Sequence, residues 1–250
     1  MECREILIRS SYDGTLQPSL FAEAEGEEKR PLLVALHTWS YDRFNQVETM
    51  LPVAEKYNLN LLLPEFRGSN LDSNPQCRLA CGSDAAIQDI FDAVEAVFPN
   101  RHVDPSAVFL AGLSGGGHMT LLALKERPNF FRAAAAFVPI TDLERWAEEN
   151  GEYRPHILAC TGGDPTEMRK RSPISYADRL ANANLKIFHG KDDDVVPMEH
   201  SLRMYLAIRE KDSKAKLYLD IFKGGHEINM NLFAEWLSGE LGQKNTAVTG

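Results

Sequence analysis

The stretch LAGLSGGGHMTLLALKE, residues 110–126, changes character at a single serine. Before Ser114 it continues an apolar run that starts at Ala107, and after it three glycines lead directly into a helix-like segment. A short, continuously apolar run bounded by turn residues is typical of a buried strand. The sequence therefore predicts a strand, a tight turn at Ser114 and a helix. It also raises the question of why a hydroxyl stands at that turn.

Strand-like and helix-like segments alternate along most of the chain. Buried strands are predicted at residues 31–37, 59–66, 107–113, 133–139, 184–190 and 215–222. Helices are predicted at residues 46–57, 83–98, 117–126, 199–211 and 228–241. Because each parallel crossover needs a covering helix, this alternation predicts a mostly parallel central sheet with helices on both faces. Residues 5–10 and 16–25 flank a turn signal and predict an N-terminal hairpin.

Length and composition favour one globular domain. The chain has 250 residues, of which 44% are hydrophobic and 25% charged, which is ordinary for a globular protein and enough for one large core. We expect a single domain over residues 1–241 and a loose tail over residues 242–250. Residues 141–180 form a long irregular excursion between two strands, which we expect to serve as a lid or pocket wall. Trp146 lies in this excursion and is predicted to line the substrate pocket.

Charge and apolar patterning exclude several classes of protein. The formal net charge of −9 argues against a nucleic-acid partner, because phosphate contacts need clustered Lys and Arg. The first ten residues do not resemble a secretory signal, and no run approaches the ~20 apolar residues of a membrane helix. The four scattered cysteines are interpreted as reduced thiols of a cytoplasmic protein. A bridge between Cys77 and Cys81 stays open as an alternative, whereas no ligand spacing supports a metal site.

The turn at Ser114 matches the pattern G-x-S-x-G between a strand and a helix, which is the context of a nucleophile elbow. So tight a turn leaves little room for side chains, which accounts for the glycines at positions 112, 115 and 116. A serine hydroxyl is a weak nucleophile and needs a general base that is itself oriented by a carboxylate. The alternative is a glycine-rich turn that binds an anion through backbone N–H groups.

Both partners of such a serine follow later in the chain. The segment KGGHEI, residues 223–228, places His226 in a glycine-flanked loop just after the last predicted strand. The segment HGKDDDVVP, residues 189–197, follows the preceding strand and supplies a loop carboxylate. The resulting order of Ser114, aspartate and His226 is the order associated with this elbow.

With these motifs in place, the sequence resembles the α/β-hydrolase family, and within it the prolyl-oligopeptidase-like branch and its stand-alone esterase relatives. The resemblance covers about residues 31–241 and rests on LHTW, EFRGSN, VDPSAVFLAGLSGGG, RSPISYAD, HGKDDDVVP and GGHE. It implies an α/β-hydrolase fold and a catalytic triad that includes Ser114 and His226.

The resemblance also selects one acid among three consecutive aspartates. In the family pattern H-G-x-x-D followed by V-P, the carboxylate lies four residues after the histidine, which points to Asp193. Asp194 is the next alternative, and Asp192 is expected to be solvated. A calcium cluster is disfavoured because no further ligand spacing accompanies the aspartates.

The oxyanion donors are expected on either side of the nucleophile. One is the backbone N–H of Gly115, directly after the serine. The resemblance assigns the other to the amide of Trp39, in the segment that corresponds to the family's H-G-x motif. Thr38 replaces the usual glycine there, so the path of this loop departs from the family pattern. Trp39 also has an alternative role as a packed aromatic residue.

The predicted function is that of a serine hydrolase without a cofactor, because acyl transfer needs only water as second substrate and no cofactor motif is present. We expect a carboxylesterase that cleaves modest acyl esters through an acyl-enzyme. The alternative is an aminopeptidase or oligopeptidase acting on short peptides, for which Glu65 and Arg67 are candidate anchors of a peptide terminus unless they form a loop salt bridge. A noncatalytic binding module is the remaining alternative, since fold alone does not decide function.

Overall fold

The computed structural model describes residues 1–242, and its strands join in one eight-stranded sheet of order β1-β2-β4-β3-β5-β6-β7-β8. The strands are β1 (Cys3–Arg9), β2 (Leu16–Ala22), β3 (Arg30–Leu36), β4 (Asn60–Pro64), β5 (Val103–Leu113), β6 (Ala133–Phe137), β7 (Leu185–Gly190) and β8 (Leu217–Phe222). All strands from β3 onward run parallel, and the β1–β2 hairpin joins them through an antiparallel pairing of β2 with β4. The predicted α/β-hydrolase architecture and its N-terminal hairpin are confirmed.

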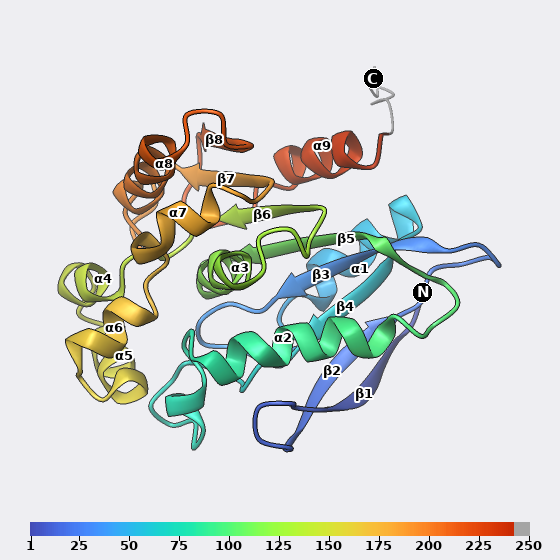
Figure 1. Cartoon of the computed structure of the whole chain (residues 1–250), viewed down its shortest axis with the longest axis horizontal. Helices are drawn as coiled ribbons and strands as arrows, with labels where there is room; N and C mark the ends of the chain where they lie inside the picture. The colour runs from blue at the N-terminus through green and yellow to red at the C-terminus, as the bar shows by residue number, and fades with distance from the viewer. Residues whose placement is uncertain (243–250) are drawn as a thin grey trace.

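Helices cover both faces of the sheet (Figure 1). The larger ones are α1 (Val47–Tyr57), α2 (Asp84–Val97), α3 (Gly115–Glu126), α8 (Glu199–Lys211) and α9 (Met230–Glu240). Apolar side chains of α2, α3 and α8 pack on one face, and those of α1 and α9 pack on the other. Within residues 1–242, no helix combines the length and the apolar character needed to cross a membrane.

The excursion over residues 141–180 is helical, which corrects the expectation of an irregular segment. It contains α4 (Leu143–Glu149), α5 (Arg154–Thr161), α6 (Pro165–Lys170), η2 (Pro173–Tyr176) and α7 (Ala177–Leu180). Side chains of Asp142 and Asp164 cap the first turns of α4 and α6. Helices this short show no sustained apolar periodicity, so tertiary packing supplies most of their stability.

A third apolar cluster lies where the excursion meets the loops at the carboxyl end of the sheet. It includes Trp39, Trp146, Ile157 and Val196. Three of the free thiols, those of Cys77, Cys81 and Cys160, also belong to it. The tail predicted at residues 242–250 falls almost wholly outside the described residues.

Candidate active site

Ser114 stands at a sharp turn between β5 and α3. Its backbone has φ 56° and ψ −115°, a region that costs energy for any residue other than glycine. A Cβ added to Gly112 would lie 2.2 Å from the carbonyl oxygen of Gly116, and one added to Gly116 would lie 2.5 Å from that of Leu36. Glycine is therefore required at both positions, where the helix and the strands approach each other. The Ser114 N–H donates to the Phe137 carbonyl at 2.9 Å.

Two backbone amides meet beside this serine. A Cβ on Gly115 would lie 2.6 Å from the nitrogen of Trp39, so the two peptide groups are in close contact. Neither N–H donates a hydrogen bond within residues 1–242. The Trp39 loop is fixed on both sides, because Thr38 N donates to Asn45 Oδ1 at 3.0 Å and Asn70 N donates to the Trp39 carbonyl at 2.8 Å. Two N–H groups without an internal partner, on peptide groups in close contact, are what a developing oxyanion requires of its donors.

Asp193 is the aspartate that contacts histidine. Its side chain is fully buried, and Oδ1 accepts from the N–H groups of Val195 and Val196, each at 2.9 Å. Oδ2 lies 2.8 Å from His226 Nδ1 and 3.4 Å from His189 Nε2. Burial on its own would raise the pKa of this carboxyl, but hydrogen bonds from His189, His226 and the Val196 N–H hold the pKa well below its usual range. Asp193 is therefore an ionised carboxylate at neutral pH.

Close backbone packing brings together the loop after β7, which carries Asp193 and is called the acid loop, and the loop after β8, which carries His226. A Cβ on Gly190 would lie 2.2 Å from the Gly225 carbonyl oxygen, so no side chain fits at the end of β7. Asp192 N donates to the carbonyl of Gly224 at 3.0 Å, which joins the two loops directly. The Asp192 and Asp194 side chains are exposed.

The three predicted catalytic residues follow β5, β7 and β8, whose carboxyl ends lie at one edge of the sheet. The Nδ1 of His226 faces an acceptor, so Nδ1 carries the proton and Nε2 keeps a lone pair. No hydrogen bond joins His226 to Ser114 Oγ in the described part of the chain. In substrate-free sites such contacts are often long and tighten when the substrate binds. The structure thus joins Asp193 to His226 and places Ser114 at the same edge.

Trp146 lies in the interior and presents no surface to a pocket, which differs from the expected pocket-lining role. Its side chain is fully buried, with its ring 4.9 Å from that of Trp39 and 4.8 Å from that of Tyr153. Its indole N–H donates to the Val195 carbonyl at 3.0 Å. The physical reason is that the excursion folds into helices whose apolar faces enclose the indole.

Two polar residues near the acid loop were missed by the sequence interpretation. His189 Nε2 lies 2.9 Å from the Val196 carbonyl oxygen and 3.4 Å from Asp193. Asn150 Nδ2 donates to the Val195 carbonyl at 3.2 Å. His189 opens the quoted H-G-x-x-D motif and was used only for its register, whereas no sequence signal marks Asn150.

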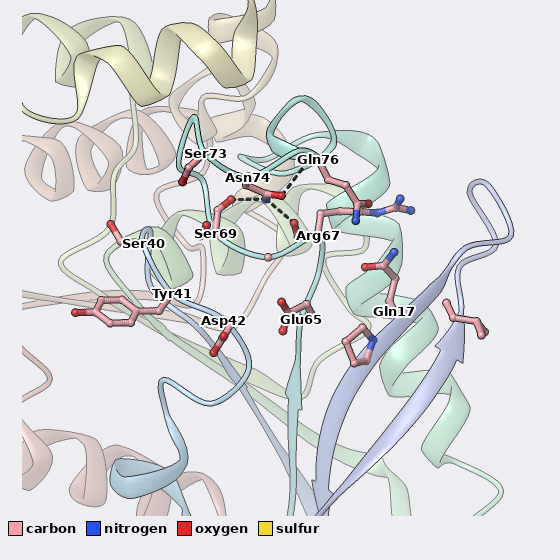
Figure 2. Close-up of a pocket in the computed structure, with 13 residues that line it drawn as sticks. Gln17, Ser40, Tyr41, Asp42, Glu65, Arg67, Ser69, Ser73, Asn74 and Gln76 are labelled. Carbon is pink, nitrogen blue, oxygen red and sulfur yellow. Dashed lines mark hydrogen bonds between the residues drawn. The ribbon is translucent and has the colours of Figure 1, made fainter.

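A polar pocket of about 510 Å³ is lined by Ser40, the residue that follows Trp39, and by neighbouring loops (Figure 2). It lies among the loop after β3, the end of β4 and the loop before η1 (Cys77–Leu79). Its walls include the side chains of Ser40, Asp42, Glu65 and Asn74. None of the three predicted catalytic residues lines it, so it adjoins the loop that carries Trp39 and not Ser114.

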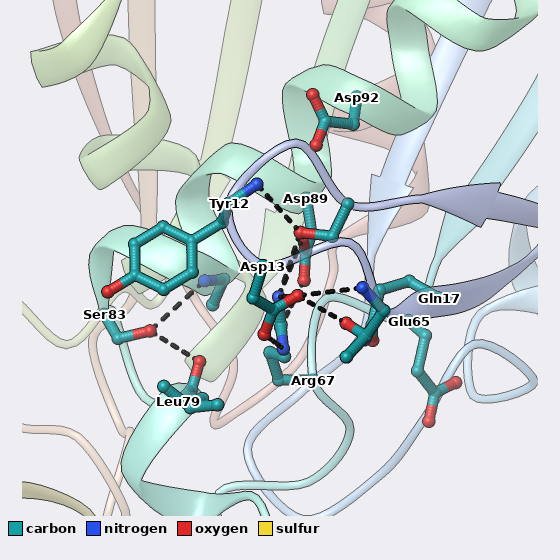
Figure 3. Close-up of polar contacts among 12 residues, drawn as sticks. Tyr12, Asp13, Gln17, Glu65, Arg67, Leu79, Ser83, Asp89 and Asp92 are labelled. Carbon is teal, nitrogen blue, oxygen red and sulfur yellow. Dashed lines mark hydrogen bonds and ion pairs between the residues drawn. The ribbon is translucent and has the colours of Figure 1, made fainter.

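Glu65 and Arg67, the candidate peptide anchors, are both engaged in ion pairs, and those of Arg67 are drawn in Figure 3. Arg67 is fully buried, with Nε 2.5 Å from Asp89 and a terminal nitrogen 2.7 Å from Asp13 of the hairpin turn. Glu65 pairs with Arg43 at 2.8 Å. Arg67 therefore ties the N-terminal hairpin to α2, and its side chain has no exposed surface with which to hold a peptide terminus.

The mostly parallel sheet, the serine at the strand–helix elbow and the Asp–His pair at the same sheet edge together define an α/β-hydrolase. Comparison with known families gives a narrower assignment, because residues 76–237 match the prolyl oligopeptidase family. The chain belongs to this family.

Similar curated proteins include acylamino-acid-releasing enzyme 2 of Oryza sativa subsp. japonica, which is 25% identical over 87% of this chain and 30% of its own length. The acylamino-acid-releasing enzyme of Homo sapiens is 26% identical over 76% of this chain and 28% of its own length. The chain thus spans less than a third of the length of these relatives.

Solved structures share the fold. An acylaminoacyl peptidase in complex with Z-Gly-Gly-Phe-chloromethyl ketone superposes with a TM-score of 0.82 at 23% identity, covering 99% of this chain and 43% of the other. A puromycin-hydrolyzing peptidase of Mycobacterium tuberculosis gives a TM-score of 0.81 at 20% identity, covering 97% of this chain and 40% of the other. At these identities the likeness establishes the architecture alone.

Proposed function

We propose that this protein is a serine peptidase that cleaves short peptides through an acyl-enzyme, with N-acylated peptides as the first substrates to test. The observation that carries the proposal is the buried Asp193 carboxylate bonded to His226 at the sheet edge that also holds Ser114. The names of the relatives support peptide bonds as the target, in place of the ester bonds expected from the sequence.

In the proposed reaction, Ser114 Oγ attacks the scissile carbonyl while His226 Nε2 accepts its proton. Asp193 holds the tautomer that makes this possible, because its carboxylate can only accept and so keeps the proton on Nδ1. It also stabilises the imidazolium that forms. His226 then gives the proton to the leaving amine, and a water molecule activated in the same way releases the acyl group.

The developing oxyanion is assigned to the N–H groups of Gly115 and Trp39. Both amides lack other partners within residues 1–242, so they are free to donate without breaking an existing bond. Gly115 also begins α3, so the positive end of the helix dipole adds to the stabilisation of the negative charge. Loss of one such donor costs about 10²- to 10³-fold in rate.

The substrate class is tested by comparing matched amides and esters. N-acetyl-alanine p-nitroanilide, alanine p-nitroanilide and p-nitrophenyl butyrate differ in whether the amine is blocked and whether the bond is an amide. We expect turnover of the blocked anilide, with a larger kcat/KM for N-acetyl-alanine p-nitroanilide than for alanine p-nitroanilide. Turnover of the butyrate alone would overturn the peptidase assignment in favour of a carboxylesterase.

Two controls make this comparison specific. Ser114→Ala, purified in parallel, removes the nucleophile and reports contaminating hydrolases. Labelling by a fluorophosphonate probe that is present in the wild type and absent in Ser114→Ala shows an activated serine before any substrate is known. Absence of labelling in folded wild type would instead support the noncatalytic alternative.

A further inference from the structure

One peptide unit of the acid loop links the excursion to the Asp193 carboxylate. The carbonyl of Val195 accepts from Trp146 Nε1 at 3.0 Å and from Asn150 Nδ2 at 3.2 Å. The N–H on the other side of this peptide bond, that of Val196, donates to Asp193 Oδ1 at 2.9 Å. All peptide bonds within residues 1–242 are trans, so the carbonyl and the N–H point in opposite directions. Helix α4 and Asp193 therefore grip the same rigid plane from opposite sides.

The chain of bonds runs from α4 to the histidine. Side chains of α4 and of its C-cap donate to the Val195 carbonyl, the Val196 N–H donates to Asp193, and Asp193 accepts from His226. Donation to a carbonyl oxygen polarises the peptide group and makes its N–H a better donor, and this cooperativity is larger where water is excluded. The Trp146 and Asp193 side chains at the two ends of this link are both fully buried, which favours such cooperativity, while Val195 and Asn150 between them are half-buried.

Helix α4 is itself held in place at its C-terminal end. Glu149, the last residue of α4, lies 3.0 Å from Nε2 of the buried His200 on α8. Asn150 is the next residue and caps the helix. The two donors therefore come from an anchored element, which suits them to hold a loop rather than to follow it.

We propose that Trp146 and Asn150 are positioning residues, which fix the Asp193 carboxylate through the Val195–Val196 peptide unit and thereby align His226. This inference rests on the proposed function. It assigns the excursion a part in orienting the proposed catalytic acid, whereas the sequence suggested only a lid or pocket wall. A pocket wall would affect substrate binding, while a positioning element affects the proton transfer.

The test removes each donor with the least change in packing. Trp146→Phe retains a buried ring and deletes the N–H, and Asn150→Ala deletes the amide. We expect each to lower kcat about 3- to 10-fold, the factor for one hydrogen bond, with KM changed less than about 2-fold. We also expect the acid limb of the kcat/KM profile to move to lower pH, because a displaced carboxylate stabilises the protonated imidazole less.

Asn182→Ala is the matched control. The Asn182 side chain donates to the carbonyls of Asp178 and Arg179 and lies before β7, at the end of the strand opposite Asp193. It should leave kcat and the pH profile unchanged. Wild-type kcat and an unmoved acid limb in the double variant of Trp146 and Asn150 would overturn the proposal, as would a change confined to KM.

A substrate-free measurement separates this proposal from the proposed function. The low-field proton NMR signal of His226 Nδ1–H reports its bond to Asp193 whether or not any peptide is cleaved. The signal should shift upfield or broaden in the double variant and stay in place in Asn182→Ala. An unchanged signal in the double variant would refute the positioning role even if the enzyme proved to be a peptidase. A changed signal would support it even if the substrate assignment failed.

Discussion

Acid stability provides a quantitative test of the packing beside Ser114, through His118 in the first turn of α3. This imidazole is fully buried, and its Nε2 donates to the Arg171 carbonyl at 2.7 Å. Burial is the main cause that lowers its pKa to about 4; the hydrogen bond to the Arg171 carbonyl opposes this shift, and the Arg171 charge adds to it. The replacement His118→Gln keeps an N–H donor of similar reach and removes the titrating group.

The sign and size follow from the difference between the folded and unfolded chains. A histidine in an unfolded chain titrates near pH 6.5, so between about pH 6.5 and 4 the unfolded chain binds a proton that the folded chain does not. The free energy of unfolding therefore falls as the pH falls through this window. At about 1.4 kcal/mol per pH unit, His118 accounts for a loss of about 2 kcal/mol between pH 7.5 and pH 5.

Urea unfolding followed by far-UV circular dichroism at pH 7.5 and pH 5 measures this loss in both proteins. The loss should be smaller by about 2 kcal/mol in His118→Gln than in the wild type. Burial also lowers the pKa values of His37 and His200, but these residues are common to both proteins and cancel in the comparison. Equal losses in the two proteins would refute the conclusion that His118 is kept neutral by burial.

Further expectations concern the proposed chemistry. Ser114→Ala should fold normally and lower kcat by several orders of magnitude, and retention of more than about a tenth of the activity would contradict its role as nucleophile. Asp193→Asn should cost on the order of 10⁴-fold in kcat, whereas Asp192→Asn should be mild; a large loss in Asp194→Asn instead would show that the acid register is off by one. Gly115→Ala places a Cβ 2.6 Å from the Trp39 nitrogen, which displaces that N–H, and should lower kcat about 10²- to 10³-fold. Wild-type kcat in this variant would argue against the Trp39 amide as an oxyanion donor.

The sequence alone was sufficient to predict the architecture, because the signals involved are local. Continuous apolar runs mark parallel strands that are buried on both faces, and the predicted β3 to β8 all appear. The helix predicted over residues 83–98 appears as α2, and the Ser83 hydroxyl caps it by accepting from Ala86 N. The glycines beside Ser114 were equally readable, since a tight elbow leaves no room for a Cβ.

Tertiary structure decided what depends on segments far apart in the chain. No local pattern shows whether the indole of Trp146 faces a pocket or the core, because that depends on how short helices pack over the carboxyl end of the sheet. The contact of Asn150 with Val195 joins residues 45 positions apart, and that of Asp193 with His226 joins residues 33 apart. Such contacts depend on the parallel arrangement of strands and on which polar groups remain to be satisfied once water is excluded. Sequence periodicity predicts the parallel arrangement of strands. It does not predict which polar groups pair, because the hydrogen-bond partner of a buried group is determined only when the chain has packed around it.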